Sequence, residues 1–175
     1  MFRARPILTA LALLLPMGAH AHIVFADAQA TAGSYYAGFL RVSHGCGLAD
    51  TVSIRVEIPA GVLSARPQPK PGWTLAVEHA PLPKPIQGEG GTTITQRVAA
   101  ITWTGRLPAD QFDQFGIMMK LPGAPGALYF PTTQRCTSGS NAWVNLPASP
   151  EAWHATKNPA PMLMLTAAHG DHAAH

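Results

Sequence analysis

Apolar and polar residues alternate in several short segments of the chain. The clearest is Thr51 to Ile58, where Val52, Ile54, Val56 and Ile58 would share one face of a strand. Segments of the same character, rich in Val, Ile, Thr and aromatic residues, are residues 34–42, 73–77, 92–104 and 126–132. Roughly eight such strands, with no sustained helical period, predict an all-β antiparallel β-sandwich.

Two proline-rich segments interrupt this pattern, Arg66 to Gly72 and Pro81 to Pro85. Alternating prolines stiffen an extended chain because each ring restricts φ. One interpretation is a docking segment for a partner protein. The other, which we favour, is a pair of rigid connections between strands.

The first 21 residues have the three parts of a secretory signal peptide. Arg3 and Arg5 precede an apolar run over residues 6–17, and Ala19-His20-Ala21 is a site of the small-x-small type. The run is shorter than the roughly 20 apolar residues of a membrane span, and the rest of the chain has none. We therefore expect cleavage after Ala21 and export to the periplasm or the extracellular space. The predicted domain is 22–166, followed by a flexible tail over 167–175.

Charge adds little once the leader is set aside. The chain has 12 Lys+Arg and 9 Asp+Glu, a formal net charge of +3. Removing Arg3 and Arg5 leaves a charge of +1, and the basic residues form no cluster. This distribution argues against a nucleic-acid partner.

Cleavage after Ala21 makes His22 the first residue of the processed chain. Its α-amine and Nδ1 can then close a chelate ring on one metal ion. Nitrogen donors in a planar arrangement suit Cu(II), which binds most tightly among the common divalent metals. A first residue can also be histidine by chance, so the interpretation needs a second ligand.

Two cysteines, Cys46 and Cys136, occur in a chain that we expect to be exported. Oxidising compartments favour a disulfide between them, whereas a thiolate metal site or a redox pair remains the alternative. His44 lies two residues before Cys46, so in an extended segment both side chains point to the same side. His44 is the candidate second ligand, or else a surface histidine at the end of a strand.

Several motifs, taken in order, resemble the YcnI-like family of exported copper-binding proteins. They are His22 to Phe25, Ala32 to Tyr36, Ser43 to Cys46, Val56 to Val62, Pro69 to Trp73, Thr102-Trp103 and Leu128 to Pro131. The resemblance implies an immunoglobulin-like or cupredoxin-like β-sandwich that binds one Cu(II) ion. It also implies a role in copper trafficking, storage or homeostasis, beside another periplasmic copper chaperone or a cuproprotein acceptor.

The resemblance also implies site residues. His22 matches the N-terminal copper ligand, and Trp143 matches a tryptophan that lies near the copper. Members of the family often have an acidic residue just before this tryptophan, where this chain has Ala142. His44 is the candidate replacement. Weaker oxygen candidates are Asp27 and Glu57.

Methionine and tail histidine side chains are further candidate metal ligands, because a thioether is a soft ligand that suits Cu(I). Met118 and Met119 would point to opposite faces of a strand, whereas Met162 and Met164 would share a face. The tail histidines His169, His172 and His175 could capture metal weakly or have no role.

We expect no catalytic site. The alternatives are a copper-dependent oxidative enzyme with an N-terminal histidine site and a metal-free extracytoplasmic interaction module.

Overall fold

The computed structural model describes residues 22–62 and 64–168. The predicted signal peptide over residues 1–21, its cleavage site and His169, His172 and His175 of the tail lie outside these ranges. Strands dominate the described chain, and within it no helix is long and apolar enough to cross a membrane. The elements are β1 (Val24–Phe25), β2 (Gln29–Thr31), β3 (Tyr35–Val42), β4 (Thr51–Glu57), β5 (Ser64–Pro67), β6 (Thr74–Gln87), β7 (Thr93–Leu107), β8 (Asp113–Lys120), β9 (Gly126–Tyr129), β10 (Thr132–Cys136), β11 (Ser140–Trp143) and β12 (Met162–Thr166), with short 3₁₀ turns η1 (Glu89–Gly91) and η2 (Pro150–Ala155).

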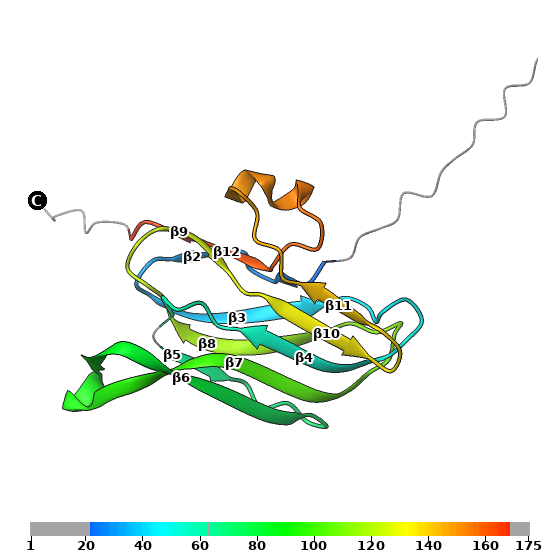
Figure 1. The fold of residues 1–175 in the computed structure, drawn as a ribbon, viewed down its shortest axis with the longest axis horizontal. Helices are drawn as coiled ribbons and strands as arrows, with labels where there is room; N and C mark the ends of the chain where they lie inside the picture. Colours follow the sequence, from blue (N-terminus) through cyan, green and yellow to red (C-terminus); the bar gives the residue numbers. More distant parts are fainter. Residues whose placement is uncertain (1–21, 63, 169–175) are drawn as a thin grey trace, which may run out of the picture.

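These strands form three sheets, and the two larger ones are the layers of a sandwich (Figure 1). The four-stranded sheet has the order β1-β3-β8-β5, and the five-stranded sheet has the order β11-β10-β4-β7-β6. A small third sheet has the order β2-β12-β9. All pairs are antiparallel except β2 with β12. The predicted antiparallel β-sandwich is confirmed.

Alternation along the strands fills the space between the two layers. Leu40 and Phe115 from the four-stranded sheet meet Ile54, Ile101 and Trp103 from the five-stranded sheet in one core cluster. Each of these side chains is almost completely buried, as the amphipathic pattern requires. The Phe115 ring lies edge-on to Trp103 with the centroids 5.5 Å apart, a favourable arrangement of two aromatic rings.

The first residue of β4 departs from the predicted alternation. Ile54 and Val56 face the core as expected, but Thr51 is completely buried although the pattern assigned it to the polar face. The pairing of β4 with β7 shifts register between Thr51 and Ser53. Such an irregularity exchanges the two faces of a strand, so Thr51 turns inward. Its hydroxyl accepts a hydrogen bond from Gln134 Nε2 at 2.8 Å.

The proline-rich segments were assigned to loops, and this prediction is wrong in part. Pro81 to Pro85 lie within β6, and Arg66 and Pro67 end β5. Both strands are at the edges of their sheets, where a missing N–H leaves no ladder bond unpaired. The β6–β7 register shifts between Pro81 and Ile86, the stretch in which the prolines lack the N–H groups of a regular ladder.

A disulfide joins Cys46 to Cys136, with the two Cα atoms 6.0 Å apart. This confirms the predicted pairing, and because both sulfur atoms take part in the bond, neither is free to act as a thiolate metal ligand in this structure. The bond connects the segment after β3 to the end of β10. Gln134, also on β10, donates from Nε2 to the His44 carbonyl oxygen at 2.8 Å. The backbone at His44 is therefore held to the facing sheet by two nearby links.

Asp50 joins two loops at this end of the sandwich. Its carboxylate accepts hydrogen bonds from Arg106 Nε at 2.7 Å and from the Ala109 N–H at 2.9 Å. The Arg106 bond, followed by the Ala109 bond, holds the pKa of Asp50 below its ordinary value.

We predict that an Asp50→Asn variant flattens the acid side of the stability profile. A lowered pKa in the folded state means that the unfolded chain binds more protons. The contribution of Asp50 is thus present above its unfolded pKa of about 3.9 and is lost as the pH falls through the folded value. The melting temperature measured from about pH 6 to about pH 3 should fall less in the variant than in the wild type. An equal fall in both chains would contradict the assignment.

Candidate metal centre

His22 lies between two tryptophan side chains. The centroid of its ring is 5.3 Å from that of Trp143 and 5.3 Å from that of Trp153, with both ring pairs tilted. In Figure 1 the start of the described chain lies beside β11 and below η2, the elements that carry these tryptophans. The imidazole is half-buried as a result.

Each of the three residues is placed by a different element. His22 precedes β1, which pairs with β3 so that Val24 lies opposite Arg41. Trp143 ends β11, where it pairs with Thr132 and points into the sandwich. Trp153 lies in η2, and its Nε1 donates to the Ala160 carbonyl oxygen at 2.7 Å. That bond fixes the orientation of the second indole.

Trp143 carries an unsatisfied hydrogen-bond donor. The side chain is only 6% exposed, and its Nε1 has no hydrogen-bond partner within the described part of the chain. Indole N–H groups usually find an acceptor when they are buried, because an unpaired buried donor costs about 1 to 3 kcal/mol. An oxygen ligand of a bound metal ion, such as water, would supply the acceptor that this donor lacks.

His44 lies at the same end of the β1–β3 strand pair as His22. It follows β3 by two residues, whereas His22 precedes the paired strand β1 by two. The Nδ1 atom of His44 lies 2.5 Å from the Gly45 carbonyl oxygen. With the proton on Nδ1, the hydrogen bond to this carbonyl leaves Nε2 as the nitrogen with a lone pair, the usual arrangement of a metal-binding histidine.

The described residues form no conventional cage for a metal ion. Within residues 22–62 and 64–168, no three His, Cys, Asp or Glu side chains gather in a group that could hold one. A site built on these residues must therefore use few side chains. The N-terminal chelate meets this condition because one histidine supplies two nitrogen donors.

The chain matches the model of one protein family over residues 22–165, which is most of its length. The family is described as a domain of unknown function, DUF1775. The chain belongs to the DUF1775 family. A comparison with curated proteins found no match.

A solved structure is similar to this DUF1775 domain. It is described as an uncharacterized protein from Nocardia farcinica with an immunoglobulin-like fold. The two chains are 28% identical with a TM-score of 0.58, and the match covers 82% of this chain and 97% of the other. The immunoglobulin-like part of the fold prediction is thereby confirmed.

The position before Trp143 does not suit a metal ligand in this DUF1775 domain. Ala142 is exposed and Trp143 is buried, because neighbouring residues of β11 face opposite sides of the sheet. An acidic side chain at residue 142 would therefore point to the outer face of the sheet, away from the side on which Trp143 is buried.

Glu57 and Asp27, the two weaker oxygen candidates, make contacts outside the His22 site. Glu57 forms an ion pair with Arg55, with Oε1 at 2.8 Å from the guanidinium. Asp27 is exposed, and its backbone carbonyl accepts a hydrogen bond from the Tyr36 hydroxyl. Burial and, to a lesser degree, the Asp27 charge raise the pKa of Tyr36 to about 12.

Trp153 is the member of the site that sequence reasoning missed. The four tryptophans are alike in the sequence, and nothing in it singled out Trp153 as a member of the site. Trp153 is buried, yet its indole also contacts His22. No local pattern separates this tryptophan from the others, since its neighbour in the fold is 131 positions away in the chain.

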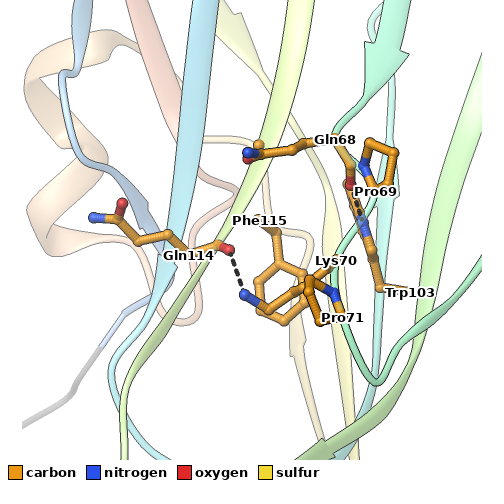
Figure 2. Close-up of a pocket in the computed structure, with 8 residues that line it drawn as sticks. Gln68, Pro69, Lys70, Pro71, Trp103, Gln114 and Phe115 are labelled. Carbon is orange, nitrogen blue, oxygen red and sulfur yellow. Dashed lines mark hydrogen bonds between the residues drawn. The ribbon is translucent and has the colours of Figure 1, made fainter.

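A small cavity of about 110 Å³ lies elsewhere, beneath the segment that follows β5 (Figure 2). Its lysine and its tryptophan are already paired. Lys70 Nζ lies 2.6 Å from Asp113 and 3.3 Å from the Gln114 carbonyl oxygen, and Trp103 Nε1 donates to the Gln68 carbonyl oxygen at 3.2 Å. These bonds hold the proline-rich segment against the sandwich, so we treat the cavity as structural.

Proposed function

We propose that the processed chain is an exported copper-binding protein that carries one Cu(II) ion at its N-terminus. The observation that carries the proposal is the placement of His22 between Trp143 and Trp153, beside a buried indole N–H without an acceptor. The family match begins at His22, the residue that cleavage after Ala21 would expose. The resemblance to the YcnI-like copper-binding proteins supports the same assignment.

The chemistry of the donors favours copper over other metals. The α-amine and Nδ1 of His22 would supply two neutral nitrogens, which suit the tetragonal preference of Cu(II). The two indoles limit the access of water and hold the imidazole in one orientation. Copper is cargo here, and its proposed source or destination is another copper chaperone or a cuproprotein. Both donors must be unprotonated, so acid should release the ion.

We predict that His44→Ala weakens Cu(II) binding about tenfold, because His44 is the proposed second imidazole and its Nδ1 faces a backbone carbonyl. The measurement is competition with a chromophoric Cu(II) chelator, using the processed chain. His79→Ala is the matched control, since His79 is an exposed histidine in β6, outside the residues that form the centre. Unchanged affinity in His44→Ala would remove His44 from the site and leave the His22 chelate standing.

Copper held for transport should be less redox-active than free copper. We expect the copper-loaded chain, reduced with ascorbate in air, to produce hydrogen peroxide more slowly than the same concentration of free Cu(II). The two tryptophans beside His22 would hinder the approach of oxygen. Peroxide production that exceeds the free ion would support the oxidative enzyme, and the absence of any Cu(II) binding would support the metal-free interaction module.

A further inference from the structure

The outer face of β12 presents two methionines side by side. Leu163 and Leu165 point into the core and are buried, whereas Met162 and Met164 are half-buried on the opposite face. Two residues of a strand span about 6.6 Å, and a methionine has three rotatable side-chain bonds. The two sulfur atoms can therefore approach one ion without any change in the backbone.

The strand positions paired with these methionines carry no charged side chain. Tyr129 lies opposite Met162, and Ala127 lies opposite Met164 on β9. On the other side, β2 places Gln29 beside Met164. Ala127 leaves space above the strand at this point, because its side chain is a single methyl group. These three paired positions neither repel a monovalent cation nor offer it a hard carboxylate ligand.

The charge of one carboxylate, Glu151, acts on Tyr129, the residue paired with Met162. Burial raises the pKa of Tyr129, and the negative charge of Glu151 raises it further. Glu151 is exposed in η2, and Tyr129, whose pKa it affects, pairs with Met162 in the sheet. A bound cation would gain from this charge through space.

From this arrangement we propose that Met162 and Met164 form a weak site for a soft monovalent metal ion, Cu(I) or its redox-stable analogue Ag(I). Thioether sulfur is a soft ligand that selects such ions over hard cations. The site needs no contribution from His22, so it stands or falls separately from the proposed Cu(II) centre. It gives the protein a binding site for Cu(I), an ion that the nitrogen donors at the N-terminus would not favour.

The other methionine pair provides an internal comparison. Met118 is 46% exposed on β8, while Met119 is completely buried. Adjacent residues of a strand face opposite sides, so these two thioethers cannot bind the same ion. The processed chain contains these four methionines and no others, since Met1 and Met17 belong to the predicted leader. The NMR signal of each methionine methyl group can therefore be assigned by single Met→Leu substitutions.

The test is a titration of the processed chain with Ag(I), followed by the methyl resonances of methionine labelled with ¹³C. The methyl signals of Met162 and Met164 should shift together and saturate at one ion, while those of Met118 and Met119 stay unchanged. The double variant Met162→Leu with Met164→Leu should lose at least tenfold in Ag(I) affinity. Met118→Leu, the matched exposed control, should lose none. Leucine conserves the volume, so the fold is retained and is checked by thermal unfolding.

Several outcomes would overturn the site. Shifts that appear first at Met118, shifts confined to one of the two β12 methionines, or unchanged affinity in the double variant would each do so. Cu(II) titration of the same double variant separates this proposal from the previous one. We expect its Cu(II) affinity to equal that of the wild type. Conversely, a chain with a blocked α-amine should still bind Ag(I) if the methionine site exists.

Discussion

Moving the α-amine away from His22 should weaken Cu(II) binding roughly 100-fold, or by about 2.7 kcal/mol. The change is a four-residue Ser/Gly extension ahead of His22 in the processed chain. It keeps the imidazole between Trp143 and Trp153 but replaces a two-nitrogen chelate with a single donor. A one-residue extension is unsuitable, because the dipeptide that it creates can itself chelate Cu(II). Affinity is measured by chelator competition, and the nitrogen coordination by electron paramagnetic resonance.

Two controls make this result specific. A chain that starts at His22 and carries the same four residues after His175 should bind Cu(II) like the wild type. The variant His22→Ala, with its α-amine in place, should lose as much affinity as the N-terminal extension, since neither donor suffices alone. Equal affinity in the extended and the native chains would rule out the N-terminal chelate. The copper proposal would then depend on His44 or on the tail.

Removing the disulfide should destabilise the fold by about 4 to 5 kcal/mol, the chain-entropy value for a loop of 90 residues. The change is the double variant Cys46→Ala with Cys136→Ala. For a domain of this size, 1 kcal/mol corresponds to about 2 to 4 °C, so the melting temperature should fall by roughly 8 to 20 °C. Calorimetry measures the melting temperature, and urea unfolding measures the free energy of unfolding.

A second measurement guards against a variant that does not fold. The wild-type chain, unfolded and refolded with and without reductant, should show the same difference in stability. Ser138→Ala, in the exposed turn after Cys136, is the matched control and should change the melting temperature little. A loss below about 1 kcal/mol would mean that Gln134 and the loop contacts hold this end without the disulfide.

The elements that followed from the sequence are those whose signal is local. The alternation from Thr51 to Ile58 predicted a half-buried strand because the period of a strand is two residues. Two cysteines in a chain that we expect to be exported allowed one pairing, and the structure contains it. The inward turn of Thr51 could not be predicted, because it depends on a register shift against β7, a strand far along the chain.

The candidate site divides in the same way. His22 followed from the leader that the sequence predicts before it, and Trp143 from a resemblance, both without knowledge of the fold. Trp153 did not, since only packing of η2 against the start of the chain brings its indole to 5.3 Å from His22. The proline-rich stretch in β6 was likewise misassigned, because its place at a sheet edge is a property of the whole sheet.

By itself, the sequence determined the strand character of this DUF1775 domain and the partners of the disulfide, and it predicted the histidine that processing would expose. These depend on residue types and on spacings within a few positions. Only the tertiary structure decided which tryptophans surround His22, which faces of β11 and β12 are exposed, and that the Trp143 N–H is buried without an acceptor. The physical reason is that burial and ring contacts arise between segments more than 100 residues apart, whose approach depends on the packing of the complete sandwich.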